Sequence, residues 1–521
     1  MTPVYDIAVV GSAFGGSLMA MIARRLGRSV LLLERGRHPR FAIGESSTPL
    51  SNLLLEALAR RFDLPAIAPL AKWGTWQQRH PGIAAGLKRG FTFLHHRFGD
   101  SFSPGPAGER ELLVAASPTD TIADTHWYRP DVDHLFQREA VALGVEYRDE
   151  VILEGWKEVG GDLVLRGSRH GRAAEYRARF LIDASGPRGF LHTTQGGAEE
   201  EIPGVTPNEA LYSHFTGVGR WEDRHPPESG APFPADDAAL HHVFPGGWMW
   251  VLRFNHGITS AGVSVTPELA AELNLAEGEP GWRRLLDRLP SVREQFQHAT
   301  ARIPFRHLPR MAFRSPPMRM PRCARLPSAV GFVDPLLSTG FALNLLGIDR
   351  LATLLQSEDL QSAEALWDHE LATQNDLLAA GRMIGGLQAH FNRPAVFSNL
   401  LMLYFAAASF SETARRLNRP HLAPGFLLHG HSTFGPESVG LLGKAVQWPL
   451  QVSSAEFRER IRRAVAPVDV GGWFDPGRTR WHPVETAPLF RAASGLESTS
   501  AEIEALLRGA GFPEEQCHPP R

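Results

Sequence analysis

Residues 332–344, FVDPLLSTGFALN, place small and polar residues where an apolar segment changes into a helical pattern. Asp334 and the proline after it end the apolar, strand-like approach, and a Ser-Thr-Gly triplet precedes the helix. Ser338 or Thr339 is a good N-cap, so backbone N–H groups near Thr339 and Gly340 should point outward without partners. The helix dipole adds partial positive charge, which makes this end a candidate site for an anion. An ordinary capped helix is the alternative.

A βαβ pattern near the N-terminus has the spacing of a dinucleotide-binding unit. The strand at residues 5–10 runs into the turn GSAFGG, and a helical segment and a second strand ending at Glu34 follow. Gly11 suits the tight turn, and the acid 34 − 11 = 23 residues later can accept hydrogen bonds from an adenosine ribose. A carboxylate there repels a 2′-phosphate, so FAD or NAD is expected rather than NADP. The cofactor candidates in this unit are Gly11, Ala13, Phe14, Gly16, Glu34 and Arg35.

Two further turns contain the small residues that let a cofactor approach the backbone. The first is GESSTP at residues 44–49, which on composition alone is a turn with a helix cap. The second follows the buried strand ARFLIDA at residues 178–184. The candidates in these turns are Glu45, Ser46, Asp183 and Gly186.

The middle of the chain is β-rich, with strand-like segments at residues 240–244, 247–254 and 258–265 and a hairpin signal, Asn-His-Gly, between the last two. Trp248 and Trp250 are two residues apart, so they face the same side of one strand. They either fill a core or form the wall of a pocket.

The expected fold is α/β (α+β). A Rossmann-like FAD-binding domain spans residues 1–200 and 300–356, an inserted β-rich substrate domain spans 201–299, and a mostly helical region spans 357–521.

Composition narrows the class of protein. The chain has 521 residues, a net charge of −2 and two cysteines, and it begins directly with a strand-like segment. The charge gives no case for nucleic acid or acidic membranes, and the cysteines give neither a disulfide framework nor a metal site. With no signal peptide and no apolar run of about 20 residues, we expect a cytoplasmic protein without a membrane span.

The motifs, taken in order, resemble the flavin-dependent halogenases, including the tryptophan halogenases. They are GSAFGG with Glu34, GESSTP, LKRGFTF, IDASG, GGWMWVLRF and FVDPLLSTG. The resemblance covers roughly residues 1–355. It places the chain among FAD monooxygenases with a para-hydroxybenzoate-hydroxylase-like fold.

The resemblance implies a role for each matching residue. FAD would lie along the candidates above, with Asp334 beside its isoalloxazine. The triplet Ser338, Thr339 and Gly340 would bind a halide ion. Lys88, which on its own would be expected at the surface, matches the catalytic lysine because it begins a K-x-x-x-x-F block, and Lys72 is the second choice. Trp248 and Trp250 match the two tryptophans of the family's W-x-W-x-I-P motif.

The implied reaction uses FAD that a separate flavin reductase has reduced. Reduced FAD, oxygen and halide would give hypohalous acid, which halogenates a small electron-rich aromatic. A homodimer is also among the expectations.

Three departures from the family pattern bear on the substrate and the reaction. Leu252 and Arg253 stand where Ile-Pro is expected, and residues 327–328 replace a usual Gly-Asp pair. Leu337 replaces the glutamate of tryptophan halogenases, which argues against free tryptophan and for a phenol, pyrrole or similar ring. A flavin hydroxylase or other FAD oxidoreductase on the same fold remains the first alternative. A flavin-fold binding or sensing module is the second.

Overall fold

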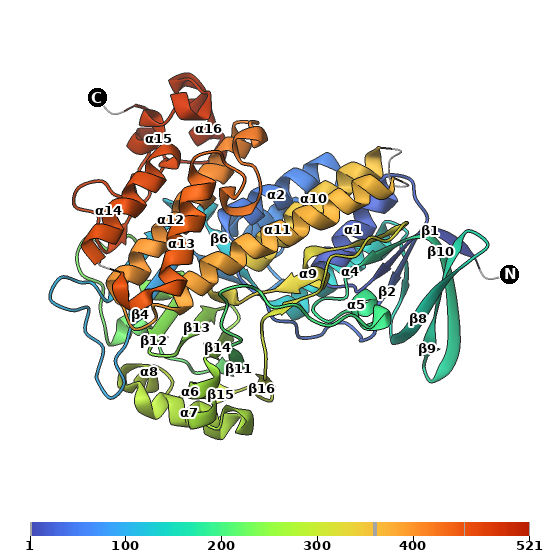
Figure 1. Ribbon diagram of the computed structural model, residues 1–521, viewed down its shortest axis with the longest axis horizontal. Coiled ribbons are helices and arrows are strands. Elements are labelled where there is room, and N and C mark those ends of the chain that lie inside the picture. Colours follow the sequence, from blue (N-terminus) through green and yellow to red (C-terminus); the bar gives the residue numbers. More distant parts are fainter. Residues whose placement is uncertain (1–2, 358–361, 453, 520–521) are drawn as a thin grey trace.

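The computed structural model describes residues 3–357, 362–452 and 454–519. Two large β-sheets follow one another along the long axis of the molecule, and long helices run between them (Figure 1). The mixed α/β architecture that the sequence predicts, with a Rossmann-like unit at its N-terminal side, is confirmed.

The first sheet has the order β7-β2-β1-β10-β9-β8, and β18 also pairs with β10. Its strands are β1 (Val4–Val10), β2 (Val30–Leu33), β7 (Glu146–Arg148), β8 (Val151–Val159), β9 (Asp162–Arg169), β10 (Arg172–Asp183) and β18 (Cys323–Arg325). Val10 is in register with Leu33 on one side and with Asp183 on the other. Because these three strands are parallel, their carboxyl ends meet at one edge, where a dinucleotide binds in such folds.

The second sheet has the order β15-β11-β14-β13-β12-β4-β5-β20, with β16 paired to β11. Its strands are β4 (Gly90–His95), β5 (Glu111–Ala115), β11 (Glu209–Thr216), β12 (Ala239–Phe244), β13 (Gly247–Arg253), β14 (Thr259–Val265), β15 (Thr300–Ala301), β16 (Arg306–Leu308) and β20 (Trp481–His482). The three strands predicted between residues 240 and 265 are confirmed. The sheet also takes strands from outside residues 201–299, so a division of the chain at those limits stays a prediction.

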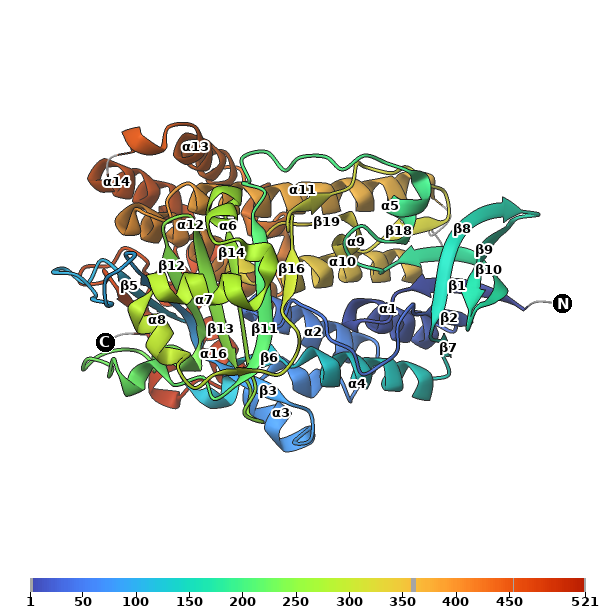
Figure 2. The same cartoon turned by 90° about the horizontal axis from the view of Figure 1, so that it is seen from below.

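Both faces of the second sheet are buried. On β13, Met249 and Val251 pack on α6 (Pro267–Glu272), α7 (Glu279–Arg288) and α8 (Pro290–Gln295), which lie over the sheet in Figure 2. Trp248 and Trp250 point to the opposite face and belong to the main core. Burial of one such large apolar side chain stabilises the fold by about 1.5–3 kcal/mol.

Helices connect the two sheets. They include α1 (Phe14–Arg25), α2 (Pro49–Arg61), α3 (Trp73–Arg79), α4 (Arg129–Ala142), α5 (Phe190–Gln195), α9 (Pro327–Val330), α10 (Thr339–Gln356), α11 (Ala363–Gln388), α12 (Pro394–Arg416), α13 (Phe434–Gln447), α14 (Ser454–Val465), α15 (Ala487–Arg491) and α16 (Ser500–Ala510). Four short strands complete the set: β3 (Ala85–Lys88), β6 (Asp124–Trp127), β17 (Phe313–Arg314) and β19 (Gly331–Phe332). Helix α10 packs against α1, α2 and α11, and α10 and α11 lie side by side in Figure 1.

Helix α12 is the one helix in the described residues that is long and apolar enough to cross a membrane by length and composition. Of its most apolar window, 72% is buried inside the protein. Its rings explain this burial: Phe397 contacts Phe93 of β4, and Phe405 contacts Phe91 of the same strand. The helix is therefore a core element on the inner face of the second sheet.

Candidate functional site

The turn after β1 and the first turn of α1 each have a position where a side chain larger than that of glycine would clash. Gly11 has φ +101°, and a Cβ on it would lie 2.4 Å from the Ala184 carbonyl oxygen. A Cβ on Gly16 would lie 1.9 Å from the Gly11 carbonyl oxygen. Ala13 occupies the N-cap position of α1 in an extended conformation, without a side-chain cap. The residue pattern that predicted a dinucleotide turn thus corresponds to a turn closed by direct backbone contact with the carboxyl end of β10.

Glu34 directly follows β2 and is 4% exposed. Its Oε2 accepts hydrogen bonds from the amide and hydroxyl of Ser12, both at 3.0 Å, and from Arg40 Nη2 at 3.0 Å. Its Oε1 accepts from the Gly36 amide at 2.9 Å. A carboxylate offers about four lone-pair positions, so a ribose hydroxyl has to replace one of these protein donors. The pKa of Glu34 is lowered, since Arg40 and the donated hydrogen bonds outweigh the desolvation that raises it.

The surroundings of Glu34 fit a polyhydroxylated nucleotide. Three buried polar atoms there have no hydrogen-bond partner among the described residues: His38 Nδ1, Arg40 Nε and the Tyr147 hydroxyl. Further along the edge, a Cβ on Gly186 or on Gly340 would meet no atom within 4 Å. Unsatisfied buried polar atoms are uncommon, so they indicate a site for a polar ligand.

Arg35 and Phe14, both predicted to bind the cofactor, lie in different surroundings. Arg35 is exposed, whereas Arg40, which the sequence analysis did not select, contacts Glu34. The Phe14 amide donates to Asp133 Oδ1 at 3.1 Å, so this amide is already paired. The Phe14 ring packs on Phe341 of α10 with a centroid distance of 4.8 Å. Phe14 thus joins the starts of α1 and α10.

The GESSTP loop is held by several buried contacts. Glu45 Oε1 lies 2.8 Å from His214 Nε2 of β11, and Ser46 Oγ lies 3.2 Å from His126 Nδ1 of β6. Ser47 bonds the Thr125 carbonyl through both its amide and its hydroxyl. The next residue, at position 48, is the N-cap of α2 in a capping box, as the composition predicted. The loop is therefore tied to β6, to β11 and to the start of α2.

Two buried carboxylates secure loops of the predicted cofactor site. Asp183 accepts hydrogen bonds from Ser185 and from the Leu191 amide, which fixes the turn after β10. Asp334 accepts from Trp248 Nε1 at 3.2 Å and from Ser264 Oγ at 2.7 Å. Burial raises the pKa of Asp334 to about 6, although these hydrogen bonds oppose the shift.

The start of α10 agrees with the prediction in position but not in capping. The helix begins at Thr339, and Ser338 is its N-cap residue, with φ +54°. The Ser338 side chain makes no capping bond, and no hydrogen bond from the amides of Thr339 or Gly340 is found among the described residues. These donors therefore remain available to an anion.

Lys88 is buried completely, contrary to the surface position expected of a lone lysine. Its Nζ donates to the Ser47 carbonyl at 2.5 Å and to Ser338 Oγ at 3.4 Å, and it lies 4.1 Å from the centre of the Phe91 ring. Burial lowers the pKa of Lys88, and the nearby Asp124 carboxylate opposes this shift. The Lys88 ammonium group thus lies beside Ser338, which directly precedes the free amides of Thr339 and Gly340.

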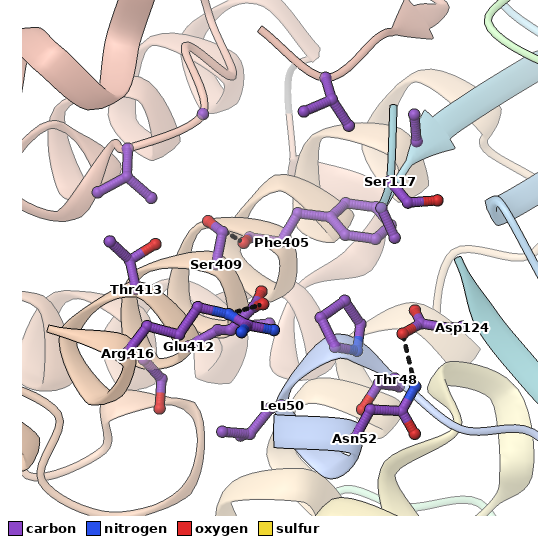
Figure 3. Close-up of a pocket in the computed structure, with 18 of the residues that line it drawn as sticks. Thr48, Leu50, Asn52, Ser117, Asp124, Phe405, Ser409, Glu412, Thr413 and Arg416 are labelled. Carbon is purple, nitrogen blue, oxygen red and sulfur yellow. Dashed lines mark hydrogen bonds and ion pairs between the residues drawn. The ribbon is translucent and has the colours of Figure 1, made fainter. Parts of the chain in front are cut away.

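A cavity of about 210 Å³ lies next to this lysine's neighbours Phe91 and Asp124, which both line it. Figure 3 shows Asn52 and Asp124 at one end of it and the Glu412–Arg416 ion pair at the other. Part of its wall comes from residues 483–489 and from 506–512 of the C-terminal region.

Of the predicted site residues Lys72, Trp248 and Trp250, Lys72 lines this cavity and the two tryptophans do not. Lys72 lines it, but its Nζ donates to the Ala510 carbonyl at 3.3 Å, toward α16. The two tryptophans are buried at 1% and 4% exposure and are not among the residues that line the cavity. Their indole N–H groups bond Asp334 and Ser260. Of the two sequence interpretations of these rings, core filling fits this placement.

The residues that differ from the family's motifs form hydrogen bonds to other parts of the fold. Arg253 Nε donates to Asp236 Oδ1 at 2.5 Å, so it secures the segment before β12. The amide of Ser328 donates to the Asn344 side chain of α10 at 3.0 Å. The Leu337 carbonyl accepts from the Tyr404 hydroxyl at 2.9 Å, which ties α12 to the turn before α10.

Sequence reasoning missed Asp124, Asn52 and Tyr404, although all three line the cavity. An available signal was the position of Asp124 at the start of a short segment that continues with Thr, His and Trp. That signal does not reveal that Asp124 pairs with Lys88. The two residues lie opposite each other in the antiparallel strands β6 and β3.

Comparison with solved structures identifies the fold. The chain matches the crystal structure of halogenase PltM in complex with phloroglucinol and FAD with a TM-score of 0.80 and 24% identity, over 92% of this chain and 99% of that one. The crystal structure of a PltM mutant in complex with FAD matches with the same TM-score and identity, over 90% of this chain and 98% of that one. The chain therefore has the fold of these FAD-binding halogenase structures.

Comparison with curated sequences extends this result. The tetracycline 7-halogenase of Kitasatospora aureofaciens is 30% identical over 349 residues, which are 65% of this chain and 61% of that protein. The monodechloroaminopyrrolnitrin halogenase PrnC of Pseudomonas fluorescens is 28% identical over 359 residues, 67% of this chain and 61% of that protein. The matches thus span about three fifths of these relatives. No sequence-family profile matches the chain. The resemblance to the flavin-dependent halogenases, first stated from the motifs, is confirmed.

Proposed function

We propose that this chain is an FAD-dependent halogenase that acts on a small electron-rich aromatic. The observation that carries the proposal is the position of Lys88. Its buried ammonium group donates to Ser338, at the start of α10, and lies 4.1 Å from the centre of the Phe91 ring, which lines the cavity. A hydroxylase on the same fold would need neither a lysine in this position nor a halide.

The proposed cofactor is FAD. Gly11, Ala13 and Gly16 would hold its diphosphate, and Glu34 with Arg40 its ribose. The segment 44–46, Asp334 and Gly340 would border its isoalloxazine. When bound and reduced, FAD would supply, with oxygen and a halide, the hypohalous acid that halogenates the substrate.

The proposed roles of the protein groups follow from their charge and placement. The free amides of Thr339 and Gly340 would hold a halide at the positive end of α10. Because these amides are already oriented in the helix, they would stabilise the negative charge of the halide without a rearrangement of the protein. Lys88 would hold hypohalous acid by a hydrogen bond and supply a proton. Leu337 offers no carboxylate, so we infer that the substrate is a ring more activated than free tryptophan.

The proposed partners follow from the same reaction. A separate flavin reductase would deliver the reduced flavin. The two cysteines, Cys323 and Cys517, are both free and buried, which is compatible with the proposed cytoplasmic location. A homodimer stays a prediction.

The test combines the purified chain with FAD, a flavin reductase, NADH, chloride or bromide, and a panel of phenols, pyrroles and indoles. Mass spectrometry should detect products that have gained a halogen. In Lys88→Met the yield should fall at least about 100-fold, the usual scale for a lost proton donor. FAD affinity, measured by titration, should be retained.

Lys72→Met is the control, because Lys72 is the lysine that lines the cavity, whereas Lys88 lies behind Phe91, and its ammonium group donates to the Ala510 carbonyl of α16. It should keep most of the product. Equal loss in both variants would contradict the role of Lys88. Oxygenated products that form without halide would establish the hydroxylase alternative instead.

A further inference from the structure

We propose that Asp124 is the substrate-binding carboxylate of this site and that it selects hydroxylated arenes by accepting a hydrogen bond from a ring hydroxyl. This inference rests on the proposed halogenase function, and it names the class of substrate. It also supplies a base in a chain that has Leu337 where tryptophan halogenases have a glutamate.

The position of Asp124 supports this role. It begins β6, is 5% exposed, and lines the cavity. Asn52 of α2 donates from Nδ2 to Asp124 Oδ1 at 2.7 Å, which fixes the carboxylate (Figure 3). The other oxygen, Oδ2, has no hydrogen-bond partner among the described residues. A buried carboxylate oxygen without a donor is costly, so a ligand that brings a donor is favoured.

The neighbouring atoms call for the same kind of ligand. Asn52 Oδ1, also buried on the cavity wall, accepts no hydrogen bond from the described part of the chain. The hydroxyl of Ser117, on the same wall, is likewise without a partner there. These polar atoms share the cavity with the apolar rings of Phe91 and Phe405. This combination fits an aromatic ring that carries hydroxyl donors better than one that carries acceptors only.

The groups around Asp124 act on its carboxyl group in opposite directions, and their net effect raises its pKa. Burial raises the pKa of Asp124, while Lys88 of β3 lowers it; Glu412 of α12 adds to the rise, and Arg416 of α12 opposes it. Lys88 is in register with Asp124, so both side chains leave the β3–β6 pair on the same side. A ring hydroxyl bonded to Asp124 would therefore place its ring near the ammonium that holds the halogenating species.

The chemical step balances with the groups named. As the ring carbon forms its bond to the halogen, the oxygen–halogen bond of hypohalous acid breaks. The oxygen leaves with the bonding pair and takes a proton from the Lys88 ammonium to form water. The ring hydroxyl gives its proton to Asp124, which leaves a halogenated dienone. Loss of the ring C–H proton, which restores the lysine through water, and return of the proton from Asp124 give the halogenated phenol.

Binding to the full chain tests the inference without the reaction. The probes are 1,3-dihydroxybenzene and 1,3-dimethoxybenzene, the same ring with and without donors, followed by calorimetry. The wild-type protein should bind the dihydroxy probe at least about tenfold more tightly, which is the smaller effect expected for a hydrogen bond to a charged group. Asp124→Asn should remove most of this preference. Equal affinities of the wild-type protein for both probes would overturn the inference, and this comparison needs no variant.

Turnover separates failure of the inference from failure of the proposed function. With FAD, reductase, NADH and bromide, the wild-type protein should brominate the dihydroxy probe in preference to the dimethoxy probe when the two compete, and Asp124→Asn should reduce this preference at least about tenfold. Equal losses of bromination for the two probes in Asp124→Asn would mean that Asp124 serves only as the counter-ion of Lys88, and would overturn the inference. If the wild-type protein produces no hypohalous acid, the proposed function fails, and the binding comparison still decides the role of Asp124.

Discussion

Lys88 and Lys72 are the same residue type in different surroundings. Lys88 is fully buried between Ser47, Ser338 and the Phe91 ring. Lys72 is half-buried and bonds a carbonyl of α16. Burial lowers the pKa of both, with the larger effect at Lys88. The motif around residue 88 predicted Lys88 as the catalytic lysine. Its enclosure supports the proposed role, since a completely enclosed ammonium is the better proton donor.

Two adjacent glycines give a residue-scale prediction. Gly16→Ala should lower the free energy of unfolding by about 3 kcal/mol or more, because its Cβ would overlap the Gly11 carbonyl oxygen at 1.9 Å. Gly15→Ala should be neutral or stabilising by up to about 1 kcal/mol, because its nearest neighbour is a leucine methyl at 3.4 Å and alanine favours a helix. Urea unfolding of both variants measures the difference. Equal stabilities would contradict the close contact.

The residues of the candidate site fall into two groups, according to whether one continuous stretch of sequence identifies them. The glycine turn, Glu34 and the 338–340 triplet were predictable because each belongs to a continuous motif. Asp124 was not, because it meets Lys88 only through the pairing of β3 with β6, 124 − 88 = 36 residues apart. Arg40 was missed for a related reason: it lies beyond the motif and returns to Glu34 through a loop.

At the scale of elements, the start of α10 offers the most direct test of the proposal. It combines a residue at φ +54° with a helix that lacks a side-chain cap, next to Gly340, which has free space where a side chain would be. A helix end of this kind costs stability unless a ligand uses its amides. The geometry therefore favours binding over stability.

Gly340→Ala should separate these two properties. The melting temperature of the cofactor-free protein should stay the same or rise, since alanine stabilises a helix by up to about 1 kcal/mol relative to glycine. The affinity for FAD or halide should fall by about tenfold or more, because the new methyl group would occupy the ligand's space and cost at least about 1.4 kcal/mol. Fluorescence titration with FAD, with and without bromide, measures this. Unchanged affinities would place the ligand elsewhere.

The second sheet shows which elements the sequence could not assign. Its hairpins between residues 239 and 265 follow from alternation and turn residues. The parallel pairing of β12 with β4 does not, because it joins residues 239–243 to 91–95, which are far apart in the chain. Apolar patterning identifies a strand but not its partner, so the sequence analysis placed this layer within residues 201–299 alone.

At the scale of the whole molecule, the buried histidines predict how stability depends on pH. His95, His126, His241 and His242 are buried, and burial lowers their pKa values to about 3, 3, 3 and 4. Because the unfolded chain takes up these protons near pH 6.5, the folded state loses stability as pH falls below about 6.5. Each histidine contributes up to about 1.4 kcal/mol per pH unit.

Asp334 acts in the opposite sense. Its pKa of about 6 lies above the unfolded value, so its contribution is lost as pH rises toward 6. Asp124 and Glu222, whose pKa values are raised to about 7, act in the same sense as Asp334. These three carboxyl groups offset part of the effect of the histidines, which also include His369, His390 and His482 with pKa values lowered to about 4. Thermal unfolding should therefore show a melting temperature that drops between about pH 7 and pH 5, with little dependence on salt, because buried groups are weakly screened. A flat profile over this interval would contradict the burial of these rings.

The cavity wall contributed by residues 483–489 and 506–512 has a consequence for biosynthesis. A ribosome releases these residues late, whereas the glycine turn and Glu34 emerge early. The nascent polypeptide can thus form the edge proposed to bind the nucleotide while the cavity is still open on one side. Under the proposed function, an interrupted translation product should retain flavin yet let the hypohalous acid escape into the surrounding water.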